Sequence, residues 1–228
     1  MNDIGENLQI TRERIQAAAQ KYDRIVDSIG LMAASKTFSA DDIKIAASAG
    51  LLEFGENYAQ EAMQKIKALA DPKLIWHFIG PIQSNKTRLI AENFNWVHSI
   101  DRFKTARRLN DARPDSSPPL NACIQINISD EKSKSGITSQ QLLDLAIQIS
   151  TLPNIRLRGL MAMPAVSKDT NKQRQSFKLV TECFQSLNKK NFKLDTLSMG
   201  TSNDLEAAIA EGSTMIRLGT AIFGPRHA

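Results

Sequence analysis

The sequence predicts an α/β fold, a single (β/α)8 barrel of the TIM type with an additional helix at its N-terminal end. Short apolar runs alternate with segments of helical spacing along the chain. Strands that are separated in this way by helices pair in parallel and are buried on both faces. The length, 228 residues, lies within the roughly 200 to 250 that one α/β barrel uses. A doubly wound open sheet is the alternative, because it contains the same alternation.

The first elements follow a βαβ order. Residues 8–22 place apolar side chains at helical spacing among charged ones, and the apolar run 29–35 predicts a short buried strand. Ser39 begins a helix that Gly50 ends, since serine is a favoured N-cap and glycine a favoured terminator. Residues 51–54 return to an extended apolar pattern, which predicts the second strand.

The same alternation continues along the rest of the chain. The expected helices are 58–69, 85–92, 102–112, 139–150, 170–187 and 204–210. The further expected strands are 74–79, 96–99, 122–128, 157–163, 194–198 and 215–218. With the first two strands these make eight, the number that closes a TIM barrel. Segment 113–119 has the proline and serine content of a linker, but the alternation resumes after it, so we expect residues 1–228 to form one domain.

The composition excludes several function classes. The net charge is +5, but 24 acidic residues are interspersed with 29 basic ones and only 6% of residues are aromatic, so we expect no nucleic-acid binding. Two cysteines and three histidines stand at no metal-ligand or disulfide spacing, so we expect neither kind of site. The N-terminal segment is polar and no apolar run approaches a membrane span. We expect a cytoplasmic protein with no membrane contact and, since no apolar stripe stands out, a monomer.

Lys36 is the first candidate site residue. It comes directly after the first expected strand, and TIM barrels place their active sites at the carboxyl ends of the strands. The apolar residues before it, 32–34, would remove water from the amine and lower its pKa, which favours the neutral form that a Schiff base requires. The alternative is a lysine that only extends its ammonium group into solvent.

Two loops rich in small residues indicate a phosphate site. Segment 198–206 joins the seventh strand to a helix, and within it Asn203 and Glu206 have the spacing of a capping box. Segment 217–220 ends the eighth strand with a glycine and a threonine. The loops after strands seven and eight form the phosphate site of many TIM barrels. An ordinary helix cap is the alternative for the first loop.

Three further clusters fall at the same expected edge of the barrel, namely 54–57, 76–86 and 133–136. Taken one at a time, they fit turns, caps and packed aromatic side chains. His77 fits a core histidine whose hydrogen bonds are satisfied. Lys134 is by default solvated, but it is a second amine near the same mouth.

Seven motifs carry a resemblance to a known family. They are Ala34-Ser35-Lys36-Thr37, Phe54-Gly55-Glu56-Asn57-Tyr58, the segment 76–86, Val97-His98-Ser99-Ile100-Asp101, Ser133-Lys134-Ser135-Gly136, Arg158-Gly159-Leu160-Met161-Ala162 and the segment 217–224. In this order they closely resemble the pyridoxal phosphate homeostasis protein family. The resemblance implies a single barrel like that of alanine racemase, which binds pyridoxal 5′-phosphate (PLP) without an established catalytic turnover.

The resemblance also implies roles for individual residues. Lys36 would hold the PLP aldehyde as a Schiff base, Arg217 would face the pyridine nitrogen, and Asn57 would lie near the ring. The implied phosphate ligands are Ser198, Gly200, Ser202, Gly219 and Thr220. Lys134 is the candidate for a second PLP site.

A non-catalytic role is expected from the residue opposite the pyridine nitrogen. Arginine is protonated at neutral pH, so Arg217 would keep that nitrogen unprotonated and weaken the ring as an electron sink. Alanine racemases add a β-rich domain and a catalytic tyrosine from the partner subunit, whereas the only tyrosines here are Tyr22 and Tyr58 and the sequence given ends four residues after Gly224. We expect a PLP carrier or buffer, with PLP-dependent apoenzymes as recipients. The alternatives are an amino-acid racemase-like PLP enzyme lacking the second domain and a class I aldolase-like barrel without a cofactor.

Overall fold

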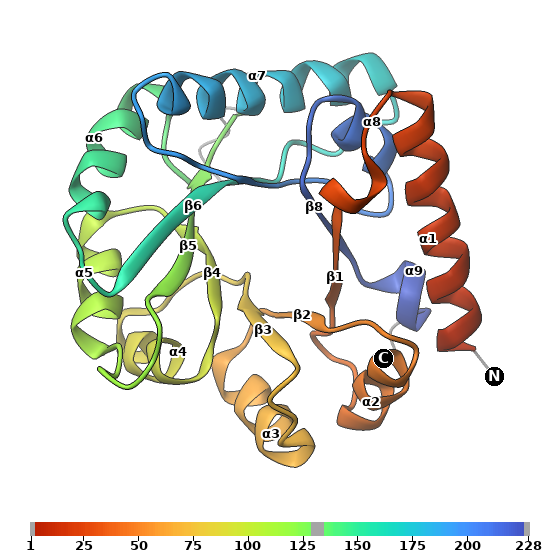
Figure 1. Cartoon of the computed structure of the whole chain (residues 1–228), viewed down its shortest axis with the longest axis horizontal. Helices are drawn as coiled ribbons and strands as arrows, with labels where there is room; N and C mark the ends of the chain where they lie inside the picture. Colours follow the sequence, from red (N-terminus) through yellow and green to blue (C-terminus); the bar gives the residue numbers. More distant parts are fainter. Residues whose placement is uncertain (1–2, 129–134, 226–228) are drawn as a thin grey trace.

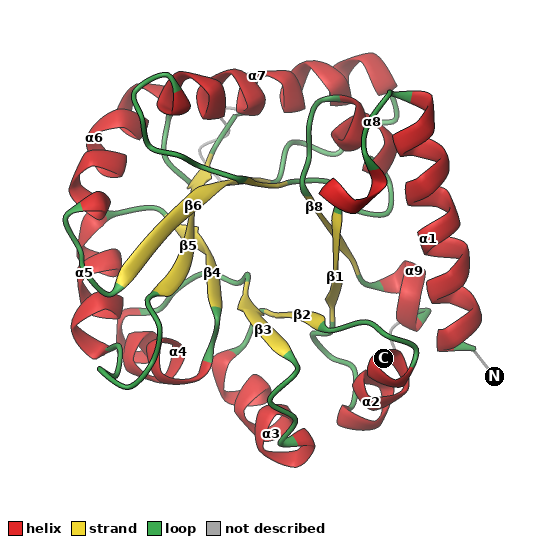
Figure 2. Cartoon of the chain, in the orientation of Figure 1, coloured by secondary structure: helices red, strands yellow, loops and turns green. Residues whose placement is uncertain are grey.

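Eight parallel strands close into a barrel, in the order in which they occur along the chain. The computed structural model describes residues 3–128 and 135–225. β1 (Gly30–Ala34) pairs with β8 (Met215–Leu218) as well as with β2 (Glu53–Glu56), and these pairings close the ring. Figures 1 and 2 show the ring of strands surrounded by helices. The predicted barrel is therefore confirmed, and the open-sheet alternative is wrong.

The strands lie close to their predicted positions. Besides β1, β2 and β8, they are β3 (Ile75–Phe78), β4 (Trp96–Ile100), β5 (Leu120–Ile126), β6 (Ile155–Ala162) and β7 (Thr196–Ser198). β5 and β6 begin two residues before their predicted starts, because their pairing already starts at Leu120 and Ile155. β2 is displaced by two residues from the prediction, since its register with β3 pairs Phe54 with Trp76.

The helices cover the outside of the ring. They are α1 (Ile4–Lys21), α2 (Ala40–Ser48), α3 (Ala59–Leu69), α4 (Thr87–Asn93), α5 (Phe103–Ala112), α6 (Ser139–Ser150), α7 (Thr170–Asn188), α8 (Leu205–Ala210) and α9 (Thr220–Phe223). The sequence pattern does not predict α9, because four residues are too few to show a helical period. The predicted cap of α2 is confirmed by a capping box of Ser39 and Asp42. Within the described ranges, no helix has the length and apolar content that crossing a membrane requires.

The predicted N-terminal helix, α1, takes the place of an eighth outer helix. It packs against α2, α8 and α9 and lies on the side of the ring where β1 and β8 meet (Figure 1). Arg14 on α1 donates to the two carboxylate oxygens of Glu206, at 2.6 and 2.8 Å, and to the carbonyl oxygen of Ser202 at 2.9 Å. α1 thereby holds the loop that follows β7.

The start of α8 differs from the prediction. Asn203 and Glu206 do not form a capping box, because Asp204 occupies the N-cap position and Glu206 pairs with Arg14. A guanidinium group is a stronger partner for a carboxylate than a backbone amide is. The carboxylate of Asp204 accepts from the N–H and the hydroxyl of Thr201, which closes the loop before the helix.

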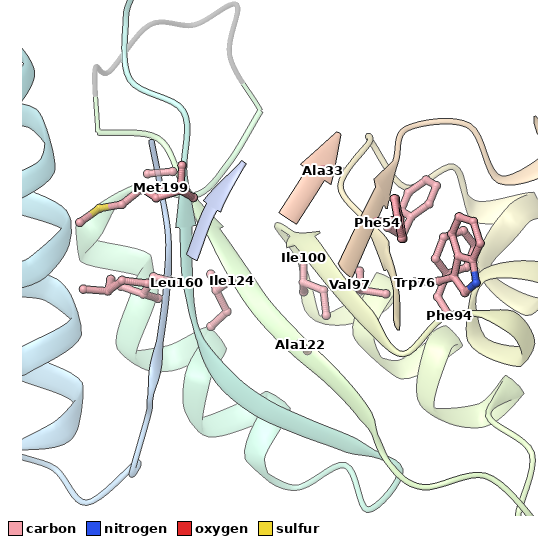
Figure 3. Close-up of a cluster of buried hydrophobic side chains, with 14 of the residues drawn as sticks. Ala33, Phe54, Trp76, Phe94, Val97, Ile100, Ala122, Ile124, Leu160 and Met199 are labelled. Atoms are coloured by element: carbon pink, nitrogen blue, oxygen red, sulfur yellow. The ribbon is translucent and has the colours of Figure 1, made fainter. Parts of the chain in front are cut away.

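Buried apolar side chains fill the space between the strands and the helices. Phe54, Trp76 and Phe94 gather on one side, where the ring centroids of Phe54 and Trp76 are 5.9 Å apart (Figure 3). Leu160 and Met199 belong to the opposite side of the same figure. Successive side chains of a strand point to opposite faces, so the residues that alternate with this layer point into the barrel. Several of those interior residues are polar, and they border the candidate site.

Candidate functional site

A cavity of about 290 Å³ lies at the carboxyl ends of the strands. It is lined by Ala34, Lys36, Asn57, Ile79, Met161, Met163, Thr201, Ser202, Asn203, Arg217, Gly219 and Thr220. The predicted site residues within this set are Lys36, Asn57, Ser202, Arg217, Gly219 and Thr220. A larger hollow between α6 and α7 contains none of them. Lys134 lies outside the described residues.

Lys36 and Asn57 enter the cavity from the ends of β1 and β2. A Cβ atom at Gly80, after β3, would lie 2.2 Å from the carbonyl oxygen of Asn57, so the glycine allows the two loops to close on each other. The side-chain Oδ1 of Asn57 is buried and accepts no hydrogen bond from the residues that the structure describes. The cavity thus combines an amine with a buried acceptor that receives no hydrogen bond from the described part of the chain.

The loops after β7 and β8 both face the cavity, as the small-residue pattern predicts. Over the described ranges, the backbone N–H groups of Ser202, Asn203, Gly219 and Thr220 donate to no protein acceptor. A Cβ atom at Gly219 would lie 3.1 Å from the carbonyl oxygen of Ala34, so the glycine keeps the β8 loop close to β1. Backbone N–H groups that converge without acceptors, together with two hydroxyls, form a site suited to an anion such as phosphate.

Ser198 and Gly200 are not brought to the cavity. Gly200 has φ of +102°, and a Cβ atom there would lie 2.6 Å from the Cβ of Ala208 and 2.8 Å from the Cδ1 of Ile216. Packing and backbone conformation therefore both require glycine. Its carbonyl accepts from the N–H of Arg217 at 3.0 Å. Ser198 is fully buried in β7 and also contacts Arg217, so both residues lie behind the cavity wall.

Arg217 forms part of that wall and is almost completely buried. Its Nη1 donates to the hydroxyl of Ser198 at 2.7 Å and to the carbonyl of the same residue, and its Nη2 donates to the carbonyl of Ala162 at 3.0 Å. Burial lowers the pKa of Arg217 to about 10, so the group is still a cation at neutral pH. The cavity therefore has a positive charge in a fixed orientation.

A chain of buried hydrogen bonds continues from Arg217 into the barrel. The hydroxyl of Ser198 lies 2.9 Å from Nδ1 of His98, and Nε2 of His98 lies 2.9 Å from Nδ1 of His77. At the far end, Nε2 of His77 is 3.4 Å from Oε2 of Glu53. We call these five residues the interior chain. The sequence predicts a buried His77 but not its connection to the cavity.

The ends of the interior chain fix the direction of its hydrogen bonds. Arginine can only donate and an ionised carboxylate can only accept. Nε2 of His77 is 3.4 Å from Oε2 of Glu53, which is an electrostatic contact and not a hydrogen bond. With the proton of His77 on this Nε2, its Nδ1 accepts from Nε2 of His98, and Nδ1 of His98 accepts from the hydroxyl of Ser198. Each imidazole then carries one proton and is neutral. Burial lowers the pKa of both histidines, which agrees with the neutral forms.

The barrel and the cavity together define the class of protein. Residues 10–227 match the family model described as alanine racemase, N-terminal domain. The alanine racemase of Corynebacterium glutamicum shares this fold with a TM-score of 0.71 at 18% identity, over 97% of this chain and 60% of that one. The chain is therefore a barrel of the alanine racemase N-terminal domain family.

Closer relatives narrow the assignment. The pyridoxal phosphate homeostasis protein of Pseudomonas aeruginosa is 53% identical over 226 residues, which cover 99% of this chain and 97% of that protein. PipY of Synechococcus elongatus, whose structure was solved with PLP bound, matches with a TM-score of 0.83 at 33% identity, over 97% of this chain and 100% of that one. The chain belongs to the pyridoxal phosphate homeostasis protein family.

Proposed function

We propose that this protein binds PLP in the cavity, holds it covalently through Lys36, and thereby buffers or delivers the cofactor. The observation that carries the proposal is the presence of three kinds of group in one cavity: an amine, a buried guanidinium, and two loops with backbone N–H groups that donate to no acceptor among the described residues. PLP has an aldehyde, a pyridine nitrogen and a phosphate, so each part of it has a matching partner. The bound PLP of PipY and the names of the close relatives support the proposal.

The ring end of PLP would meet three side chains. Nζ of Lys36 would bond to the aldehyde carbon, whose oxygen leaves as water. Arg217 would face the pyridine nitrogen and donate to it. The buried Oδ1 of Asn57, which accepts no hydrogen bond from the described residues, would accept one from the ring hydroxyl.

The phosphate would lie between the loops after β7 and β8. The hydroxyls of Ser202 and Thr220 and the backbone N–H groups that start at Ser202 and Gly219 would hold it. Ser198 and Gly200 have another role in this proposal. They hold Arg217 from behind through its guanidinium and its backbone N–H, and so contribute to binding indirectly.

We propose further that the protein turns over no substrate and acts as a monomer that supplies PLP-dependent apoenzymes. Bound PLP supplies a ring that stabilises a carbanion, most strongly when its nitrogen is protonated. Arg217 is a cation and keeps that nitrogen unprotonated. A racemase-like activity would appear as a change in enantiomer composition when the PLP-loaded protein is incubated with single L-amino acids. Sustained turnover in that assay would contradict the carrier role.

Reduction with borohydride and mass spectrometry of the peptides tests the attachment site. We expect the pyridoxyl label on Lys36 in the wild type, and Lys36→Ala should lose the trapped adduct while the fold is kept. Lys86→Ala is the matched control, because Lys86 lies beside the mouth in a neighbouring hollow that shares Asn57 with the cavity. A label found only on another lysine of the wild type would contradict the proposal. If added PLP does not bind and the purified protein shows no visible absorbance, the aldolase-like alternative would be favoured.

A further inference from the structure

A buried group of charges lies directly behind Lys36 and has no part in the proposed function. Lys65 on α3 places its Nζ 2.8 Å from Oε1 of Glu56 and 2.6 Å from Oε1 of Glu61. The side chain of Lys65 is 7% exposed, that of Glu56 is fully buried and that of Glu61 is 30% exposed. We call these three residues the Lys65 cluster. It lies between α3 and the ends of β1 and β2, outside the barrel.

The Lys65 cluster bonds to the residues on both sides of Lys36. On the β1 side, the carbonyl of Ser35 accepts from the ammonium group of the cluster at 2.9 Å, and the hydroxyl of Ser35 donates to Glu56 at 2.7 Å. On the other side, the N–H of Thr37 donates to Oε1 of Glu61 at 2.8 Å. The backbone that enters Lys36 and the backbone that leaves it are thus held by one connected group.

Thr37 shows why such a hold is needed. Its φ is +70°, in the left-handed region that a β-branched residue rarely adopts. A strained residue keeps its conformation only when its surroundings impose it. The contact with Glu61 imposes it on the side of Lys36, and on the other side Phe38 stacks on Phe223 with ring centroids 4.6 Å apart. The direction in which Lys36 leaves the backbone therefore depends on the Lys65 cluster.

Stability alone does not explain why charges are buried at this place. A buried ion pair adds little net stability, and apolar residues of the same size often replace one without loss. α3 already packs on the barrel through the buried Ala59 and Ala62. An apolar side chain at position 65 would fill the space, but it would leave the carbonyl of Ser35 without its donor. The specific contribution of the charges is the position of the β1 loop.

We propose that Lys65 and Glu61 are positioning residues that hold the amine of Lys36 at the aldehyde of the bound ligand. The inference rests on the proposed attachment through Lys36. A residue that only stabilised the fold would affect binding of all ligands equally, whereas a positioning residue affects ligands that have an aldehyde. Loss of the contact between Glu61 and Thr37 should weaken capture of an aldehyde, and it should spare the contacts of Arg217 and of the phosphate loops, because those come from β7 and β8.

Glu61→Ala is the principal test, since Glu61 is partly exposed and the variant should keep its fold. Two ligands are compared by equilibrium titration: PLP, and 4′-deoxypyridoxine 5′-phosphate, which has a methyl group in place of the aldehyde. Removing one hydrogen bond to a charged group corresponds to about tenfold in affinity, so we expect that loss for PLP and less than about twofold for the analogue. Asp41→Ala, which removes an exposed acid from the first turn of α2, is the control and should change neither affinity.

Thr37→Gly provides a second, independent readout. Glycine adopts positive φ without strain, so the backbone at position 37 needs the contact with Glu61 less. In the Thr37→Gly background, the loss of PLP affinity caused by Glu61→Ala should shrink to about threefold or less. The trapped adduct on Lys36, followed by peptide mass spectrometry at equal occupancy, should form more slowly in Glu61→Ala and recover in the double variant.

Three results would overturn the proposal: unchanged PLP affinity in Glu61→Ala, equal losses for the two ligands, or the same loss in both backgrounds. These results are distinct from a failure of the proposed function. If the wild type carries no label on Lys36, the attachment itself is wrong. If the label is on Lys36 and the variants behave like the wild type, only the positioning role is wrong.

Discussion

Two buried polar groups hold residues that line the cavity, and they do so by different chemistry. The Lys65 cluster, outside the barrel, joins one ammonium to two carboxylates. The interior chain, inside the barrel, joins a guanidinium to a carboxylate through a hydroxyl and two neutral imidazoles. Each group ends on a residue of the cavity, since the first holds the backbone around Lys36 and the second holds the side chain of Arg217.

The difference follows from access to water. Glu61 is partly exposed, so water can share in solvating the Lys65 cluster. His77 and His98 are completely buried and His98 already lies near the cationic Arg217, so an added positive charge would be unfavourable. A chain of neutral donors and acceptors orients a cation without adding charge to the interior. Each side of the barrel therefore uses the kind of polar contact that its surroundings allow.

Lys65→Met should give the largest effect and tests the ionic side of the comparison. Removing one partner of a buried ion pair leaves an uncompensated charge and costs about 3 kcal/mol or more. Urea unfolding should show a loss of this size, whereas Lys67→Met, on the exposed face of the same helix, should be nearly neutral. A small loss in Lys65→Met would mean that Glu56 is protonated in the native protein.

Thr220→Val and Ser198→Ala separate the cavity from the chain behind it. Thr220→Val removes the hydrogen bond that Thr220 is proposed to donate to the phosphate, worth about 1.5 to 3 kcal/mol, so it should weaken binding of PLP more than binding of unphosphorylated pyridoxal. Ser198→Ala should weaken both ligands to a similar extent, because it loosens Arg217 rather than the phosphate loops. Titration of the two ligands checks this. If Ser198→Ala weakens PLP but not pyridoxal, Ser198 is a phosphate ligand after all.

His98→Leu tests the neutral side of the comparison. It leaves the hydroxyl of Ser198 and Nδ1 of His77 without their partner, and an unsatisfied buried group costs about 1 to 3 kcal/mol. His98→Gln can both accept and donate and should lose less in urea unfolding. If His98→Gln is as unstable as His98→Leu, the side chain acts by packing and the interior chain has no energetic role.

The smallest expected effect is a pH dependence of opposite sign in the two groups. Burial raises the pKa of Glu56 above its ordinary value of 4.5. The contribution of Glu56 to the free energy of unfolding is therefore present at low pH and is lost as pH rises through the native pKa. Burial lowers the pKa of His77 and His98 below 6.5, so their contribution is present above pH 6.5 and falls as pH drops below it. Unfolding free energies measured against pH should lose the first slope in Glu56→Gln and most of the second in His98→Leu. Unchanged slopes would show that other groups determine the pH dependence.

The fold, and the position of Lys36 and of the two small-residue loops at the cavity, could be predicted from the sequence because they depend on local patterns. Apolar runs mark the strands, and the strand-end rule alone places Lys36 and the two small-residue loops at one mouth. Ser198 shows the limit of that rule. It stands at the end of a strand like the loop residues, but the strand alternation turns its side chain into the barrel, toward His98.

The Lys65 cluster could be predicted only in part, since the i,i+4 spacing of Glu61 and Lys65 indicates a pair on one helix face but not its burial against the β1 loop. Lys65 looks like an ordinary lysine of an amphipathic helix, and it lies 30 positions from Ser35, whose carbonyl it contacts. Only the placement of α3 against β1 and β2 brings them together. The sequence gives one weak indication of the interior chain, namely one histidine in each of two successive apolar strands. Ser198 in β7, the partner of His98, lies 100 positions further along the chain.

The closure of the ring by its first and last strands also has a consequence for synthesis. Arg14 contacts Glu206, 192 positions away, and β1 pairs along one edge with β8. A chain emerging from the ribosome therefore presents open strand edges until its final segment is free, which is a hazard for association between nascent chains. Arg217 and Thr220 also come last. The cavity can therefore form completely only after β8 has left the exit tunnel, and the proposed ligand would find its complete site only then.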